Sequence, residues 1–307
     1  MKQNTEEAVT LERINPFDSP ELTAHRQKLM DALDGLPLCC ENPITNSDCV
    51  PDRRQVILLI KDLQALMFPA YFRVSDSHRG EEGDLYTWAL NGLTGLITLC
   101  LPFFNEGAAR DAKELALLFL SEIPRIKGLL IGDAQAIYEG DPAARSCEEV
   151  LICYPGFYAI SIHRLAHALF QLDIPLLPRV MSEFAHEKTG IDIHPGASIG
   201  ERFCIDHGTG IVIGETAVIG HDVKLYQGVT LGAKSFSLDD QGNPVKGVQR
   251  HPRIGSSVVI YANAVILGGD TMVGDNCVIG GNVWLTESLG DNQMTYYDGD
   301  KIKTRSL

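Results

Sequence analysis

The sequence lacks the features that would place it in a membrane or on nucleic acid. Its longest apolar run, Leu93 to Phe104, is too short to span a bilayer and contains a proline. Lys and Arg number 26 against 40 Asp and Glu, and at a net charge of −14 no basic stripe is left for a phosphate backbone. The acidic, polar start has no apolar signal-peptide core. We therefore expect a cytoplasmic protein with no membrane or nucleic-acid partner.

The sequence also lacks the spacings that mark metal sites and disulfide frameworks. Its eight cysteines include no C-x-x-C pair, so reduced thiols are expected. His163 and His167 are four residues apart on a predicted helix, but the Glu of the H-E-x-x-H zinc motif is absent. They are predicted to serve helix packing. No metal is expected.

Two halves of the chain follow different patterns, which predicts an α+β fold. Residues 51–189 show apolar residues at helical spacing, as at Val56, Leu59, Ile60 and Leu63. They are predicted to form an α-helical domain. Residues 1–50, with several prolines, are predicted to be irregular or weakly ordered.

From about residue 190 apolar residues recur at every sixth position, with one two-residue slip after Ile211. Neither the period of a helix nor that of a strand produces this pattern. A six-residue period marks a parallel β-helix, in which each hexad is a short strand plus a turn and its lead residue fills the interior. The lead positions are residues 193, 199, 205, 211, 213, 219, 225, 231, 254, 260, 266, 272, 278 and 284.

The repeat domain is expected to cover residues 190–285, with one interruption. Residues 233–252 are too polar and too rich in Gly and Pro for the wall, so they predict an extruded loop, and such loops often carry function. Residues 286–307 leave the repeat and are predicted to form a tail that caps its open end.

Several sequence motifs in and before the repeat resemble those of a known enzyme family. The stretches "DIHPGASIG", "DHGTGIVIGETAVIG", "QGVTLGAKS" and "RHPRIG", preceded by "DPAARS" and "SCEEV", closely resemble the serine O-acetyltransferases of cysteine biosynthesis. The match covers roughly residues 130–285. The resemblance implies a left-handed parallel β-helix, a homotrimer or dimer of trimers with active sites between protomers, and acetyl transfer from acetyl-CoA, as co-substrate, to the hydroxyl of L-serine. Cysteine synthase, the sulfhydrylase that uses O-acetylserine, is a partner of the family through a tail ending in isoleucine, whereas this chain ends at Leu307.

A base is the first requirement of such chemistry, because a serine hydroxyl is almost fully protonated at neutral pH. Histidine suits this role, and His207 is the candidate. Asp206 and Asp192 are the two acids that could orient it. Asp206 is the poorer orienter, because neighbours on an extended segment point to opposite faces. Asp192 lies close to one coil earlier, which makes a contact possible.

The resemblance assigns the remaining roles. It pairs Asp192 with His207 and gives the substrate ammonium to Asp141 and Asp206. A zwitterion also needs cations for its carboxylate, which the resemblance places at Arg250 and His251.

Coenzyme A is expected in the groove between protomers. Gly232, Ala233 and Ala262 match family positions that contact it, while Lys234, Lys246 and Arg253 are candidate partners for its phosphates. A family position that usually bears a lysine falls at Cys277.

Three alternatives stay open at this point. The chain could acylate a different hydroxyl or amine, such as one on a sugar. It could be a catalytically silent binding partner of the sulfhydrylase. It could use His186, His194 and His221 with His207 as zinc ligands, as some β-helical carbonic anhydrases do, although the helical half and the "RHP" loop argue against this.

Overall fold

The computed structural model describes residues 20–34, 50–73, 83–103, 110–236, 238–299 and 301–306. The chain divides into two compact units, Met1–Cys49 and Val50–Leu307. In the first unit, helix α1 spans Pro20–Asp34, so the prediction of irregular structure is wrong for these residues. The reason is local: Pro20 occupies the helix start, where no amide donor is needed, and Pro16, Pro37 and Pro43 lie outside the helix. The other residues predicted to be irregular lie outside the described ranges, apart from Val50.

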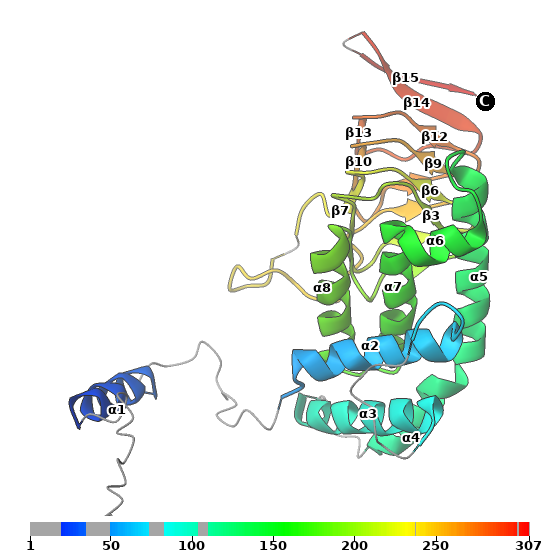
Figure 1. The fold of residues 1–307 in the computed structure, drawn as a ribbon. Coiled ribbons are helices and arrows are strands. Elements are labelled where there is room, and N and C mark those ends of the chain that lie inside the picture. The colour runs from blue at the N-terminus through cyan, green and yellow to red at the C-terminus, as the bar shows by residue number, and fades with distance from the viewer. Residues whose placement is uncertain are drawn as a thin grey trace, which may run out of the picture. The chain divides into compact units, whose positions relative to one another are not determined.

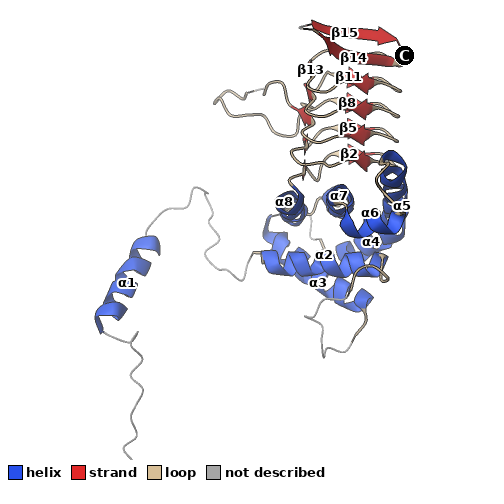
Figure 2. Ribbon diagram, turned by 45° about the horizontal axis from the view of Figure 1, so that its top comes forward, coloured by secondary structure: helices blue, strands red, loops and turns tan. Residues whose placement is uncertain are grey.

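The second unit begins with helices that gather at one end of a stack of strands (Figures 1 and 2). Among the described residues, no helix is both long and apolar enough to cross a bilayer. The helices are α2 (Arg53–Met67), α3 (Leu85–Cys100), the 3-10 helix η3 (Leu101–Phe103), α4 (Ala112–Ser121), α5 (Ile123–Gly140), α6 (Cys147–Cys153), α7 (Pro155–Gln171) and α8 (Leu177–Thr189).

After α8 the chain coils through three sheets of mainly parallel strands, placing one strand in each sheet per turn. Strands β1, β4, β7, β10 and β13 form the first sheet, β2, β5, β8 and β11 the second, and β3, β6, β9, β12, β14 and β15 the third. Figure 2 shows the second sheet as a ladder of short arrows. The first six strands are β1 (Asp192–Ile193), β2 (Ser198–Ile199), β3 (Cys204–Ile205), β4 (Val212–Ile213), β5 (Val218–Ile219) and β6 (Lys224–Leu225). The others are β7 (Thr230–Gly232), β8 (Arg253–Ile254), β9 (Val259–Ile260), β10 (Val265–Leu267), β11 (Met272–Val273), β12 (Val278–Ile279), β13 (Trp284–Leu285), β14 (Gln293–Asp298) and β15 (Lys301–Ser306).

Two residues of most hexads point inward, the lead residue and the one two positions before it. Phe203 with Ile205, and Val223 with Leu225, are fully or almost fully buried in this way. Stacked coils therefore bury a continuous apolar column, as expected for a solenoid whose single repeats cannot bury their own faces.

The hexad prediction is wrong after Ile266. Met272 and Trp284 were expected inside but are 52% and 57% exposed, whereas Val273, Ile279 and Leu285 fill the interior. The turn after Ile266 holds one extra residue, which moves the inward phase by one position. Val278, the third misassigned lead residue, is partly buried, with Ile279 inside.

The two-residue slip lies in the corner between β3 and β4. Ile211 is buried, but it is the second inward residue of its hexad, and Ile213 is the lead. The extra residues therefore belong to the "DHGTG" corner, residues 206–210. As a result Asp192 pairs in register with Val212.

Two segments depart from the regular coil. Between β7 and β8 the structure describes residues 233–236 and 238–252, and the segment between these strands leaves the stack as a loop (Figure 1). The coil then continues past Trp284 for longer than predicted. Leu289 bridges to Val273, and β14 pairs in parallel with β12 before turning back into β15. Leu307 lies outside the described residues.

A buried ion pair joins the helices to the first coil. Arg164 on α7 contacts Asp133 on α5 through two hydrogen bonds of 2.6 and 2.8 Å. Arg164 also donates to the carbonyls of Ile199 and Gly200, and the Phe203 N–H donates to Asp133. All the charged groups thus have partners, which is what a buried pair requires.

Replacing Arg164 with leucine should lower the free energy of unfolding by about 3–5 kcal/mol, because Asp133 would be left buried without its partner. Denaturant unfolding followed by circular dichroism measures this. Arg125→Leu, which breaks an exposed ion pair with Glu122, is the matched control and should cost less than about 1 kcal/mol. Equal losses in the two variants would contradict a structural role for the buried pair.

Candidate active site

The corner at residues 206–210 presents His207 outward. His207 adopts a left-handed backbone with φ of 58°, and its side chain is 73% exposed. Gly208 follows with φ of 91°, and a Cβ there would lie 2.5 Å from Ile191. Only glycine fits this position. The Gly210 N–H donates to the Gly190 carbonyl at 2.7 Å, so the corner rests on the end of α8.

Two acidic side chains, Asp206 and Asp141, lie at this corner. Asp206 is mostly buried, and its Oδ1 lies 3.7 Å from His207 Nε2. Its Oδ2 lies 2.9 Å from Lys224 Nζ. Asp141, just after α5, accepts hydrogen bonds from the Tyr154 hydroxyl at 2.6 Å and from the Ala143 N–H at 2.8 Å. These bonds, with weaker contributions from the charges of Lys224 and His207, lower the pKa of Asp141. The structure thus brings Asp141, Asp206 and His207 together.

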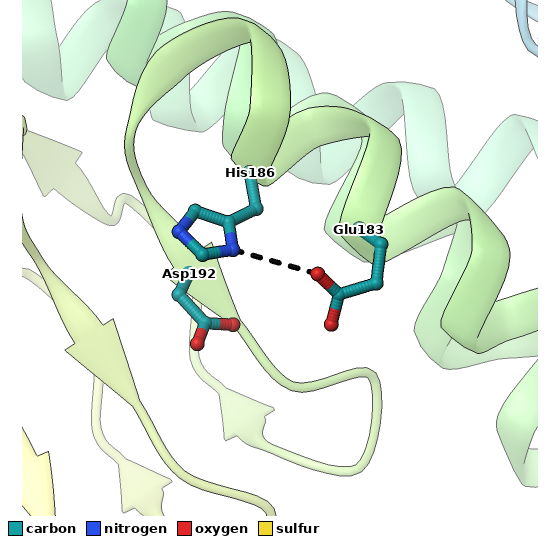
Figure 3. A group of neighbouring side chains, drawn as sticks. All are labelled: Glu183, His186 and Asp192. Atoms are coloured by element: carbon teal, nitrogen blue, oxygen red, sulfur yellow. Dashed lines mark ion pairs between the residues drawn. The ribbon is translucent and has the colours of Figure 1, made fainter.

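Asp192 lies instead beside two side chains of α8. Figure 3 shows it below His186, with Glu183 next to that ring. One ligand atom from each of the three lies within 4.8 Å of the others, and His186 Nδ1 is 3.5 Å from Glu183. Glu183 also pairs with Arg179 at 2.5 Å. In the part of the chain that the structure describes, no hydrogen bond or ion pair joins Asp192 to His207, so their pairing stays a prediction. The expectation that the protein binds no metal also stays a prediction.

Arg250 and His251 lie at a different corner, between the first and second sheets. The N–H groups of both residues donate to Thr216 Oγ1 at 3.0 and 3.1 Å, which fixes them beside the turn after β4. The Arg250 guanidinium pairs with Glu215. A Cβ at Gly214 would lie 2.0 Å from the His251 ring, so glycine is needed there.

His251 was expected to be a cation, but its ring is neutral at neutral pH. Burial, helped by the charge of Arg250, lowers the pKa of His251 to about 4. The Thr216 N–H donates to His251 Nδ1 at 3.1 Å, so the neutral ring carries its proton on Nε2. At neutral pH the side chains of Arg250 and His251 therefore offer one cation and one neutral donor, where two cations were expected.

The residues expected to contact coenzyme A are also divided between these corners. Gly232, Ala233 and Lys234 lie at the Arg250 corner, where Lys234 and Arg250 border a cavity of about 250 Å³. Ala262 lies two coils above Asp206, just after β9 in the third sheet. The exposed Lys246 and Arg253 lie in the loop and on β8, on the side of the Arg250 corner.

Cys277 was matched to a family position where a lysine usually faces the cofactor, and the structure contradicts this match. Its side chain is fully buried inside the coil, and its thiol donates to the Gly290 carbonyl at 3.0 Å. A residue at this position cannot present its side chain to a groove.

Sequence reasoning missed Tyr154, Lys224 and Thr216. Tyr154 and Thr216 hold predicted site residues in place, and Lys224 pairs with one of them. A signal existed for Lys224 alone, because it follows Asp206 by the nominal length of one coil. Tyr154 contacts Asp141 through packing of α5 against the following helices, which no repeat period reveals.

Comparisons with known proteins place this geometry in a family. A curated serine acetyltransferase encoded on a plasmid of Synechococcus elongatus is 48% identical over 256 residues. The match covers 78% of this chain and 79% of that protein. The chain belongs to the serine acetyltransferase family. It is therefore an acyltransferase. No protein-family model matches it.

Solved structures agree with this family. Serine acetyltransferase 1 of Entamoeba histolytica, crystallised with L-cysteine, is 35% identical with a TM-score of 0.68, and the match covers 82% of this chain and 93% of that one. Isoform 3 from the same organism, crystallised with cysteine, is also 35% identical, with a TM-score of 0.64 and coverage of 87% and 89%. They share the helical part followed by parallel sheets.

Proposed function

We propose that this acetyltransferase moves an acetyl group from acetyl-CoA to the hydroxyl of L-serine, giving O-acetyl-L-serine and CoA as the first step of cysteine biosynthesis from serine. Family membership supports the substrate class. The observation that carries the proposal is the division of charged groups between two corners of one chain.

The two corners match the two ends of a zwitterion. Asp141 and Asp206 form an acidic half suited to an ammonium group, while Arg250 and the Nε2–H of His251 form a half suited to a carboxylate. L-Cysteine carries the same two charged groups as L-serine, so it would fit the same two halves.

His207 acts as the general base in this proposal. Its imidazole takes the hydroxyl proton as the serine oxygen attacks the thioester carbonyl, and a C–O bond forms. The C–S bond then breaks, and the imidazolium returns the proton to the departing thiolate. The family resemblance gives Asp192 the role of orienting His207, whereas in the structure Asp206 Oδ1 lies 3.7 Å from His207 Nε2.

The proposal also includes the assembly. The three-sheet coil is left-handed, and copies associate as a trimer, alone or paired, so that the acidic half of one chain faces the Arg250 half of its neighbour. In a closed ring each copy uses two different surfaces, so every interface can complete one site. Ala262 of one copy and Gly232, Ala233 and Lys234 of the next would then border the groove for coenzyme A. The cysteine synthase complex stays a prediction.

A panel of acceptors tests the function. Thiol release from acetyl-CoA should rise well above hydrolysis with L-serine, and mass spectrometry should find O-acetyl-L-serine. An amino sugar should give only the hydrolysis rate. Acetylation of the sugar with no signal from L-serine would show instead an acyltransferase for a different acceptor.

A further inference from the structure

Lys224 inserts a cation into the acidic half of the site. It lies on β6, opposite Cys204 of β3, and points toward the end of α5. Its Nζ lies 2.9 Å from Asp206 Oδ2 and donates to the Gly140 carbonyl at 2.6 Å. The ammonium also lies 4.5 Å from the centre of the Tyr226 ring, at cation–π distance.

The surroundings of Lys224 hold its ammonium in this place. Its side chain and that of Asp206 are 15% and 13% exposed. A Cβ at Gly140 would lie 3.2 Å from Cys204 Sγ, which is tight, and 3.6 Å from Lys224 Nζ, so the end of α5 packs closely on this lysine. Tyr226 stacks on Tyr261, with ring centres 5.1 Å apart. Burial lowers the pKa of Lys224, but hydrogen bonds to Tyr226 and Asp206 outweigh it and raise the pKa, so Lys224 stays charged.

We propose that Lys224 is a positioning residue of this site, which holds Asp206 Oδ2 so that Oδ1 faces His207 and leaves the acidic half with one net negative charge. This inference rests on the proposed function. Asp141 and Asp206 alone would carry two negative charges against the single charge of a substrate ammonium. With Lys224 the charges match, and His207 has a cation as well as carboxylates nearby.

Other ionisable groups lie beside Lys224 but pair with one another. Glu139 and Asp222 border a small cavity there and share one cation, Arg202, which pairs with both at 2.6 Å, so this separate cluster carries one net negative charge. Cys204 and Tyr154 are neutral at working pH: burial raises the pKa of Cys204 to about 12, and the hydrogen bond to Asp141 raises that of Tyr154 to about 12. The Tyr226 ring lies beneath the ammonium.

The pH profile should report this cation. A positive charge near an imidazole disfavours the imidazolium. Removing the charge should move the acidic limb of kcat/KM for L-serine to higher pH by about 0.5–1 unit at low ionic strength. High salt should shrink the shift.

Three substitutions separate charge from structure. Lys224→Gln keeps a donor for Asp206 and Gly140 but removes the charge, Lys224→Met removes both, and Lys224→Arg keeps the charge. The limb should move by the same amount in the Gln and Met variants and stay in the Arg variant. Lys113→Met, which removes an exposed lysine on α4, controls for net charge and should leave the profile unchanged.

Each outcome decides the inference. A shift shared by the Gln and Met variants supports it, and if the Met variant fails to fold, the Gln variant alone decides. An unmoved limb, a limb moved to lower pH, or an equal shift in Lys113→Met overturns it. If the unaltered protein makes no O-acetyl-L-serine, the proposed function fails. If it does so while the Gln variant keeps the original limb, only the role of Lys224 fails.

Discussion

His207→Ala should lower kcat for acetyl transfer by about 10²–10⁴-fold, because no other group at its corner can take the hydroxyl proton. Asp206 is the nearest candidate, but Lys224 Nζ occupies one of its oxygens, and a carboxylate is a weaker base than an imidazole. The KM for acetyl-CoA should change little. Steady-state rates of thiol release, with corrections for uncatalysed hydrolysis, give the values.

The matched control for this variant is His221→Ala. His221 is also exposed and lies at a corner of the coil, but between the second and third sheets. Its substitution should leave kcat unchanged. Circular dichroism and size exclusion should show both variants folded and assembled like the parent. A His207→Ala variant with near-normal kcat would remove this residue from the mechanism.

Arg250→Met should raise the KM for L-serine by about 10–100-fold, because charge-assisted hydrogen bonds contribute about 1.5–3 kcal/mol. The loss also leaves Glu215 without its cation, so that its carboxylate would repel the substrate carboxylate. The KM for acetyl-CoA should stay near its original value. Initial rates with each substrate varied in turn separate these effects.

A paired variant and a control sharpen this result. Glu215→Gln keeps Arg250 and should change the KM for L-serine far less than Arg250→Met does. Arg125→Met removes an exposed guanidinium at the start of α5 and should have no effect. If the KM for acetyl-CoA rose instead of that for L-serine, Arg250 would belong to the coenzyme subsite beside Lys234.

The hexad repeat predicted the interior residues well up to Ile266, after which one turn holds an extra residue. In the pairs Met272–Val273 and Trp284–Leu285 either residue could fill the interior, and hydrophobicity cannot choose between them. The choice depends on the length of the preceding turn, where an extra residue adds no apolar signal. The same reasoning applies to the two-residue slip. It was detected but placed after Ile211, whereas the extra residues lie before Ile211, in the corner at residues 206–210.

The site residues were predictable as types, but their pairings were not. Periodicity made a contact between Asp192 and His207 possible, and that pairing stays a prediction. It did not show that Asp192 pairs in register with Val212 and lies beside Glu183 and His186. The charge state of His251 depends on its burial against Gly214, which the sequence does not express. The division of site residues between corners follows from the three-sheet path of the chain.

The central claim is that two copies of the chain complete each site, and complementation between variants tests it most directly. His207→Ala and Arg250→Met chains with different tags are expressed together, and mixed assemblies are purified through both tags. In a mixed ring of three copies about one site in three combines an intact His207 half with an intact Arg250 half. At L-serine concentrations too low for Arg250→Met sites to turn over, the account predicts recovery of about a third of the original activity per chain.

The matched control mixes His207→Ala with Asp141→Asn. Both changes affect the acidic half, so each mixed site would contain an acidic half with one defect, and no activity should return. Mixed His207→Ala and Arg250→Met assemblies that remain as inactive as their parents would contradict the account, because the two groups would then act within one chain.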